Sequence, residues 1–434
     1  MSENSIQERG ATAKNASFKC ADTSTSSRNH ALNAIADALD HHRAAIKQAN
    51  ASDIKRSQAE KLAAPLLKRL AFDDAKIDSV IQGIRDLIVL DDPIGQTKLA
   101  TELDTGLDLY RVTCPIGVIG IIFESRPDAF VQISVLCLKS GNAVLLKGGR
   151  EALETNRILY QIISNATAQI GYPDHWIQNL ESREDVSDML ALDDTIDLII
   201  PRGSNAFVRY IMEHTNIPVM GHSEGLCHVY IDASADPKKA IPVAVDAKSQ
   251  SVAVCNAEET LLIHESIAPV ILPPLKKAMD AAGVHLRGDL AVRNIIDAEI
   301  ANDSDWQTEY LDYILSIKIV KNLSEAIDHI NHFGSGHTDV IVTEDLESAR
   351  KFTAQVDSAG VFVNCSSRFA DGFRYGFGAE VGISTAKLHA RGPVGLDGLV
   401  SYKYKLLGHG QIVEDYENGS KHFTHRPLHQ QCPL

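Results

Sequence analysis

Seven single cysteines are the residues whose type most directly suggests covalent chemistry. Their number is odd and none form a C-x-x-C pair: Cys20, Cys114, Cys137, Cys227, Cys255, Cys365 and Cys432. This distribution is typical of a reduced, cytosolic protein and argues against a disulfide framework or a zinc site. Cys137 lies in the apolar run Val135–Leu138 and is expected in the core, whereas a structural or a functional role stays open for Cys227 and Cys365.

Cys255 is the cysteine whose surroundings best fit a nucleophile. It follows the amphipathic segment Lys238–Val252 and precedes the apolar run Leu261–Ile263, so we expect it in a loop between a helix and a strand. A thiol in such a loop can be exposed and can meet backbone N–H groups, which favour a thiolate and a developing oxyanion. Composition alone still leaves an inert cysteine as the commoner interpretation.

Two strand–turn–helix segments could hold a nucleotide cofactor. The first strand ends at Lys147 and continues through Gly148, Gly149 and Arg150 into a helix. Ligands bind at the carboxyl ends of such strands, and a basic residue there accommodates the 2′-phosphate of NADP. The segment therefore favours NADP, although a plain tight turn explains it as well.

The second segment places Gly203 and Ser204 between the strand Leu198–Ile200 and the helix Asn205–His214. Gly203 allows a close backbone approach, and Ser204 is a good N-cap. The free N–H groups at the start of the helix would suit a pyrophosphate. Capping alone explains Ser204 equally well, and the sequence contains no G-x-G-x-x-G fingerprint.

Basic residues near glycine- and proline-rich turns are candidates for binding an acidic substrate. Arg126 follows the apolar run Val118–Phe123, and Lys387, His389 and Arg391 lie within five residues. A solvated charged face and a fixed anion-binding loop are both open for these residues. The histidines show no spacing typical of a metal site, so no metal is predicted.

Apolar runs alternate with amphipathic segments along most of the chain, a pattern typical of parallel sheets covered on both faces. The expected strands are Val118–Phe123, Ala143–Leu146, Leu198–Ile200, Val229–Ile231, Leu261–Ile263, Val340–Val342 and Val361–Val363, and the expected helices are Ala129–Lys139, Glu151–Ile170, Asn205–His214 and Lys238–Val252. Two such series, before and after roughly Pro237, predict two α/β domains.

Two alternating segments fit neither domain. Thr97–Thr113, around Asp104-Thr105-Gly106, is typical of a β-hairpin, and Gly398–Tyr416 alternates again. Such segments need a sheet to complete, from the same chain or from a second subunit. The polar ends, residues 1–27 and 417–434, are expected to be flexible tails.

Length and charge limit the classes of function. A chain of 434 residues predicts two or three domains. With 42 basic and 57 acidic side chains, the net charge of −15 argues against binding nucleic acid or an anionic membrane. No apolar run approaches the roughly 20 residues that span a bilayer, and no signal segment is recognised.

Six blocks of the sequence, in order and at consistent spacing, resemble the γ-glutamyl phosphate reductases of the aldehyde dehydrogenase superfamily. The resemblance covers about residues 28–416, through Val118–Pro127, Pro201–Ala206, Gly221–Asp232, Val254–Leu262, Ala359–Gly372 and Lys387–Pro393. It implies an aldehyde dehydrogenase-like α/β fold with an NADP-binding domain (28–236, with the hairpin 97–113), a catalytic domain (237–395) and an oligomerisation strand segment (396–416).

The resemblance also implies a mechanism. Cys255 would attack the γ-carbonyl of L-glutamyl 5-phosphate to form a thioester, which NADPH would reduce to L-glutamate 5-semialdehyde, the second step of proline biosynthesis from glutamate. Ser125 stands where aldehyde dehydrogenases carry an oxyanion-holding Asn, and Glu309 matches the glutamate that holds the nicotinamide ribose. Asn256, beside the nucleophile, is a further candidate for substrate binding together with Arg126, Lys387 and Arg391.

Departures from the superfamily sharpen this assignment. The segment Met220–Glu224 lacks, at its start, the Glu that activates water in hydrolytic aldehyde dehydrogenases, and a reductase benefits because hydrolysis would waste the acyl phosphate. A hydrolytic glutamate-semialdehyde dehydrogenase and an inactive scaffold are the rival hypotheses. The sequence predicts a cytoplasmic homo-oligomer, and it leaves open dimer or tetramer and an association with glutamate 5-kinase.

Overall fold

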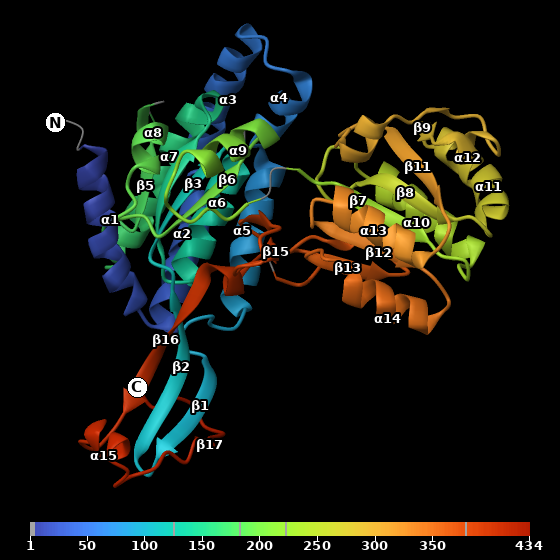
Figure 1. The fold of residues 1–434 in the computed structure, drawn as a ribbon. Helices are drawn as coiled ribbons and strands as arrows, with labels where there is room; N and C mark the ends of the chain where they lie inside the picture. The colour runs from blue at the N-terminus through green and yellow to red at the C-terminus, as the bar shows by residue number, and fades with distance from the viewer. Residues whose placement is uncertain (1–4, 125, 182–183, 222–223, 378–379) are drawn as a thin grey trace.

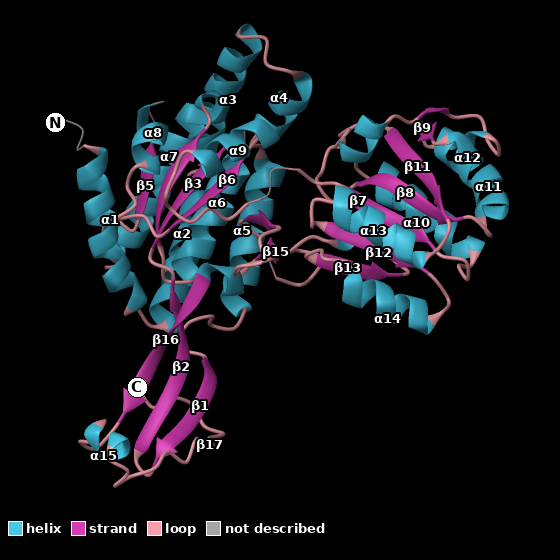
Figure 2. Ribbon diagram, in the orientation of Figure 1, coloured by secondary structure: helices cyan, strands magenta, loops and turns pink. Residues whose placement is uncertain are grey.

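Two α/β lobes and a small antiparallel sheet make up the molecule (Figure 1). The computed structural model describes residues 5–124, 126–181, 184–221, 224–377 and 380–434. The first lobe and the small sheet adjoin each other, and the second lobe lies to one side (Figure 2). Among the described residues, no helix combines the length and apolar character needed to cross a bilayer.

The first lobe is built on a parallel sheet with the strand order β5-β4-β3-β6. Its strands are β3 (Val118–Phe123), β4 (Ala143–Gly148), β5 (Ile177–Leu180) and β6 (Leu198–Arg202), all nearly completely buried. The chain runs from β3 outward to β5 and then returns to place β6 on the other side of β3. The order of strands therefore reverses between β3 and β6, which is where open α/β sheets bind ligands.

Helices cover both faces of this sheet. One large apolar cluster joins one face to α2 (Thr25–His41), α5 (Asp74–Val89), α6 (Pro127–Lys139) and α7 (Leu153–Gln169). A smaller cluster covers the other face with α1 (Ile6–Ala21), α8 (Glu184–Leu190) and α9 (Asn205–Glu213). The lobe also contains α3 (Arg43–Ala59), α4 (Ala64–Leu70) and the 3₁₀ turn η1 (Arg150–Ala152).

The second lobe holds a seven-stranded, entirely parallel sheet with the order β10-β9-β11-β8-β7-β12-β13. Its strands are β7 (Cys227–Ile231), β8 (Glu258–His264), β9 (His285–Gly288), β10 (Glu299–Ile300), β11 (Ile314–Val320), β12 (Thr338–Val342) and β13 (Gly360–Val363). One face is covered by α10 (Pro237–Ser249), α11 (Ala268–Ala281) and α12 (Leu290–Arg293), the other by α13 (Leu323–Phe333) and α14 (Leu346–Gln355). Two 3₁₀ turns, η2 (Asp303–Gln307) and η3 (Ser367–Phe369), lie in its loops.

The predicted hairpin is present as β1 (Thr97–Asp104) and β2 (Leu107–Pro115), joined through Gly106 at a φ of 70°. The sheet that completes it comes from the same chain, because β16 (Val400–Leu407) pairs antiparallel with β2. The expected C-terminal tail is wrong in part. Residues 414–417 form α15 (Glu414–Glu417), and β17 (Arg426–Pro427) pairs with β1 as the far strand of this four-stranded sheet.

The expected N-terminal tail is also wrong over residues 6–21. These residues form α1, whose Ser5 and Glu8 make a reciprocal capping box. Small and apolar residues of α1, Ile6 and Ala13 among them, are buried against the first sheet. The polar composition that suggested a tail belongs to the outer face of an amphipathic helix.

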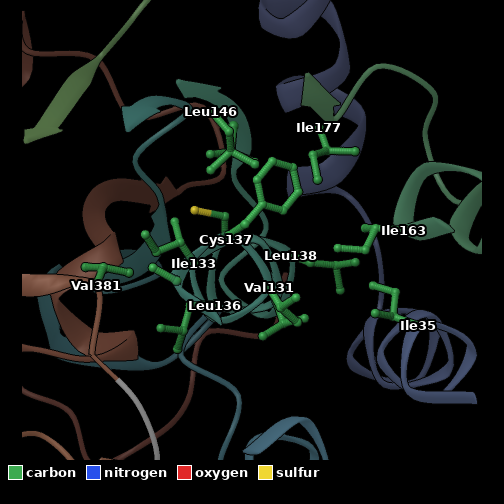
Figure 3. Packing of buried hydrophobic residues seen from close by; sticks show 14 of the residues in the cluster. Ile35, Val131, Ile133, Leu136, Cys137, Leu138, Leu146, Ile163, Ile177 and Val381 are labelled. Carbon is green, nitrogen blue, oxygen red and sulfur yellow. The ribbon is translucent and has the colours of Figure 1, made fainter. Parts of the chain in front are cut away.

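The domain limits differ from the prediction at two places. Strand β7 belongs to the second sheet, so the chain crosses between lobes before Cys227 and not at Pro237. Pro237 is the first residue of α10, a position that proline favours because its missing N–H is not needed there. Further on, residues between Val381 and Leu399 return to the first lobe, where Val381 packs with Ile133 and Leu136 of α6 (Figure 3).

This returning segment contains β14 (Gly382–Ser384), β15 (Gly392–Val394) and the 3₁₀ turn η4 (Leu396–Leu399). Figure 3 also shows Cys137 inside the same apolar cluster. Burial raises the pKa of its thiol. The prediction that Cys137 is a core residue is confirmed.

Candidate functional site

Cys255 lies in the loop between α10 and β8, as the sequence predicts. Two other short segments reach the same edge of the second sheet: Gly225 and Leu226 precede β7, and His337 precedes β12. Because β8, β7 and β12 are parallel neighbours, their amino ends meet at one edge. The topology thus brings Cys255, Gly225 and His337 together although up to 112 residues separate them in the sequence.

Contacts fix Cys255 from two sides. Its Sγ lies 3.2 Å from Nε2 of His337. The thiol of Cys227 donates to the carbonyl oxygen of Cys255 at 3.3 Å. Gly225 packs so closely that a Cβ placed on it would lie 2.2 Å from that same carbonyl oxygen. The nucleophile loop therefore rests on β7 and presents its sulfur to an imidazole.

The protein groups around Cys255 disfavour a thiolate. Burial, together with the carboxylates of Glu309 and Glu380, raises the pKa of the thiol to about 12, although Arg202 acts in the opposite direction. The sulfur is consequently protonated at neutral pH. A nucleophilic role requires a group that accepts its proton.

One cation of the first lobe, Arg202, interacts with Cys255, and Arg126 lies beside Arg202. Arg202 ends β6 and Arg126 follows β3, so both lie where the strand order of the first sheet reverses. Burial and the neighbouring Arg126 lower the pKa of Arg202, whereas Glu380, 4.0 Å away, raises it. Arg126 itself pairs with Asp128 at 3.1 Å. The carboxyl edge of the first sheet thus meets the amino edge of the second.

Arg368 adds a third cation from η3. Burial and the charge of Arg374 lower the pKa of the Arg368 guanidinium, whereas Asp371 and a thiolate at Cys255 raise it. Its Nε donates to Oε1 of Gln250 at 2.9 Å. Two guanidinium groups interact with Cys255 and a third lies beside one of them, a set suited to a substrate that carries more than one negative charge.

The predicted cofactor residues of the first segment lie at the carboxyl end of β4. Lys147 is buried and donates from Nζ to the carbonyl oxygen of Gly148 at 2.7 Å. Arg150 is 69% exposed, with its guanidinium 3.5 Å from Glu60. Arg56 of α3 donates to the carbonyl oxygen of Arg150 at 3.0 Å and so adds a further cation to this corner.

The second segment fits the phosphates of a dinucleotide. Ser204 is the N-cap residue of α9, as predicted, but its side chain makes no capping hydrogen bond. Its backbone N–H donates instead to Glu124, whose pKa is raised by burial and by Glu151. The backbone at the start of α9 thus donates to a carboxyl group, and the same N–H groups could donate to a pyrophosphate. A Cβ on Gly203 would lie 3.0 Å from Phe207, so the glycine keeps this turn close.

Glu309 connects the two lobes through a hydrogen bond near Cys255. Its Oε2 accepts a hydrogen bond of 2.6 Å from Nδ2 of Asn205, the first residue of α9. The same carboxylate raises the pKa of Cys255. Glu309 therefore lies between the start of α9 and the nucleophile, where the nicotinamide end of a bound dinucleotide would have to reach.

Three further residues predicted to bind substrate lie in the described part of the chain. Asn256 is buried and donates to the carbonyl oxygen of Ala370 at 2.8 Å, while its Oδ1 has no hydrogen-bond partner among the described residues. Lys387 and Arg391 both pair with Asp357. Ser125 lies outside the described residues.

A family model described as the aldehyde dehydrogenase family matches residues 1–299 and 288–379. The γ-glutamyl phosphate reductase of Acetivibrio thermocellus is 61% identical over 430 residues, which cover 99% of this chain and 100% of the relative. The chain belongs to the γ-glutamyl phosphate reductase family. The family member of Natronomonas pharaonis is 52% identical, with 95% of each chain covered. The crystal structure of the Thermotoga maritima γ-glutamyl phosphate reductase matches with a TM-score of 0.92 at 40% identity, covering 94% of this chain and 100% of that one.

Membership in the γ-glutamyl phosphate reductases confirms the predicted aldehyde dehydrogenase-like α/β fold and makes the chain an oxidoreductase. Aldehyde dehydrogenases use a nicotinamide cofactor, and the predicted cofactor residues follow β4 and β6 in this chain. Among the described residues, no group of three or more His, Cys, Asp or Glu side chains is arranged to hold a metal ion.

Four residues of the site were not predicted from the sequence: Arg202, His337, Arg368 and Glu380. Arg202 could have been predicted, because it ends a strand directly before Gly203 and ligands bind at the carboxyl ends of such strands. His337 and Glu380 carry no local signal. They reach Cys255 only because distant loops meet at one sheet edge.

Proposed function

We propose that this chain catalyses the NADPH-dependent reduction of L-glutamyl 5-phosphate to L-glutamate 5-semialdehyde and phosphate, the second step of proline biosynthesis from glutamate. The observation that carries the proposal is the position of Cys255 near Arg202 and Arg368, with Arg126 beside Arg202, in a chain that is 61% identical over 430 residues to a γ-glutamyl phosphate reductase. A thiol surrounded by guanidinium groups suits an electrophile with an anionic leaving group.

The three arginines divide the substrate's charges. L-Glutamyl 5-phosphate carries a phosphate at one end and an α-carboxylate at the other, and Arg126 and Arg202 share the end of the site formed by the first sheet. Arg368 approaches Cys255 from the second lobe. Lys387 and Arg391, which pair with Asp357, stay predicted substrate ligands.

The chemistry proceeds through a thioester on Cys255. The thiolate sulfur forms a bond to the γ-carbonyl carbon, the C–O bond to phosphate breaks, and phosphate leaves with the electron pair. The Cys255 backbone N–H holds the oxyanion, and Ser125 and Asn256 are candidates for its other donor. A bound reduced nicotinamide supplies the hydride. Cys255 then leaves as a thiolate when the adduct collapses to the aldehyde.

The preference for NADPH rests on the cations after β4. Lys147 donates to the carbonyl oxygen of Gly148, and Arg56, which pairs with Asp53, donates to the carbonyl oxygen of Arg150. The guanidinium of Arg150 lies 3.5 Å from Glu60. A basic group in this position favours the 2′-phosphate of NADP over the free hydroxyl of NAD. Gly203 and Ser204 contribute the turn before α9, and Glu309 the ribose contact.

The reverse reaction provides the test. With L-glutamate 5-semialdehyde, phosphate and NADP⁺, the wild-type protein is expected to form NADPH only when phosphate is present. Cys255→Ala should abolish the signal, and Cys114→Ala, the same change in the small sheet, should retain it. NADPH formed without phosphate would favour the hydrolytic dehydrogenase, and no signal from folded wild-type protein would favour an inactive scaffold.

We also propose that the chain forms a homodimer or homotetramer through the small sheet. Strand β16 is an edge strand, and it exposes Tyr402, Tyr404 and Leu406 along one face. Edge strands and apolar stripes of this kind commonly pair with another chain. An association with glutamate 5-kinase stays a prediction from the family resemblance.

A further inference from the structure

His337 is the imidazole that contacts the nucleophile. Its Nε2 lies 3.2 Å from Sγ of Cys255, and its Nδ1 lies 2.9 Å from Oγ1 of Thr338. The ring is 1% exposed. One ring nitrogen of His337 therefore contacts the sulfur of Cys255, and the other contacts the hydroxyl of Thr338.

We infer that His337 accepts the proton of the Cys255 thiol and later returns it, acting as the general base and acid of the reaction. The chemical steps of this inference rest on the proposed function. The contact between the two side chains is independent of the proposed function. Nothing in the sequence around His337, Gly336-His337-Thr338, marks it as a partner of a cysteine.

The backbone holds His337 in place for this role. Its carbonyl oxygen accepts from the N–H of Gly360, and the carbonyl oxygen of Gly336 accepts from the N–H of Ala359, at 2.9 and 2.8 Å. Thr338 begins β12, next to β13. When Nδ1–H donates to the Thr338 hydroxyl, Nε2 carries the lone pair and is directed at the thiol.

The need for a base follows from the surroundings of the sulfur. Burial, Glu309 and Glu380 all hold the proton on Cys255, and Arg202 only partly opposes them. Transfer to Nε2 creates a thiolate beside an imidazolium, and the two opposite charges stabilise each other at contact distance. Cysteine–histidine pairs activate thiols in this way on unrelated folds.

The protons balance over one turnover. His337 takes the thiol proton, the thiolate attacks, and the imidazolium gives its proton to the departing phosphate as the C–O bond breaks. After hydride transfer and collapse, Cys255 leaves as a thiolate. One proton from solvent, entering through His337, then restores the thiol. The net reaction consumes one hydride and one proton, as reduction of an acyl phosphate to an aldehyde requires.

The test is the pH dependence of Cys255 alkylation by iodoacetamide, followed by mass spectrometry on the cofactor-free protein. The charged and titratable groups around the pair are Cys227 of β7, Asp339 of β12, Glu309, Glu380, Arg202 and Arg368. In wild type we expect the rate to change less than about tenfold between roughly pH 7 and 9, because the imidazole accepts the thiol proton as the sulfur attacks and hydroxide is not needed.

His337→Gln keeps a polar side chain but cannot accept the proton. We expect it to react at least about tenfold more slowly at neutral pH, with a rate that rises about tenfold per pH unit because hydroxide then supplies the base. His332→Gln, an exposed histidine of α13, is the matched control and should behave as wild type. Equal neutral rates for wild type and His337→Gln would overturn the inference.

Wild type alone also decides the question if His337→Gln fails to fold. A wild-type rate that itself rises tenfold per pH unit from neutral pH upward would show that no group assists the thiol. Alkylation needs neither substrate nor cofactor, so this outcome is independent of the reverse assay. A flat alkylation profile with a failed reverse assay would refute the proposed function and leave the His337–Cys255 pair standing.

Discussion

At the scale of single residues, the position of Cys255 is set by backbone packing as much as by its side-chain contacts. Gly225 lies against Cys255, where a Cβ would come within 2.5 Å of its Cα and 2.6 Å of its Cβ. Real Cβ atoms do not approach backbone this closely, so any side chain at position 225 must displace the nucleophile loop. Cys227, two residues on, then holds the carbonyl oxygen of Cys255.

Gly225→Ala is therefore expected to impair catalysis without unfolding the protein. A shift of the sulfur by about 1 Å can cost roughly 100-fold in rate, and we expect a loss of kcat of that order in the reverse assay. Gly221→Ala is the matched control, because a Cβ at Gly221 meets its nearest neighbour, Pro201, at an ordinary 3.4 Å. Equal kcat values for the two variants would show that the loop adapts.

At the scale of elements, a buried ion pair joins the two ends of the loop that carries Cys255. Lys248 near the end of α10 donates to Glu259 at the start of β8 at 2.7 Å, with both side chains almost fully buried. Glu259 also accepts from the N–H of Leu311, which follows the Glu309 segment. The pair thus connects both ends of the loop that carries Cys255 with the segment that carries Glu309.

A second buried carboxyl lies beside this pair. Both oxygens of Glu258 lack a hydrogen-bond partner among the described residues. Burial raises its pKa well above the ordinary value, and burial raises the pKa of Glu259 to about 7 while Lys248 opposes both shifts. The charge of Lys248 therefore offsets part of the cost of burying the carboxyl groups of Glu258 and Glu259.

Lys248→Met should destabilise the second lobe strongly, because it leaves Glu259 without its partner. Breaking a buried pair costs about 3–5 kcal/mol, which corresponds to a Tm lower by roughly 6–20 °C for a domain of this size. The double variant Lys248→Met/Glu259→Met should recover most of that loss, since it removes both charges. Calorimetry of the three proteins checks this, and a Tm for Lys248→Met within about 2 °C of wild type would contradict it.

At the scale of the whole molecule, the site is assembled from two different sheet edges. The carboxyl edge of the first sheet provides Arg202 and Arg126, and the amino edge of the second provides Cys255 and His337. Such an arrangement requires the two lobes to keep their relative position. The hydrogen bond from Asn205 to Glu309 and the ion pairs of Asp357 with Lys387 and Arg391 join elements of the two lobes.

The proposed oligomer is also a property of the whole molecule. Substituting Tyr404→Glu and Leu406→Glu together places two charges in the exposed stripe of β16, and we expect the oligomer to dissociate into monomers. Lys403→Glu, on the opposite face of the same strand, is the control and should leave assembly unchanged. Light scattering after size exclusion measures the mass. A monomeric wild type would refute the proposal.

Most of the elements around the site could be predicted because their signals are local. Strand β3 has the expected limits, and Cys255 lies in the expected loop between a helix and a strand. Continuous apolar runs predict buried parallel strands wherever they occur, and a proline or glycine marks a turn through its own backbone preferences. The same reasoning failed at residues 6–21, where small residues hid an amphipathic helix.

The sequence by itself determined the α/β alternation, the thiol chemistry open to Cys255 and, through its motif blocks, the family. Only the tertiary structure decided which residues surround that thiol. His337, Glu380 and Arg202 lie far apart along the chain, and no periodicity relates them. They meet because parallel strands place their ends at common edges and because two such edges adjoin, which is a consequence of strand order and lobe packing that no local pattern encodes.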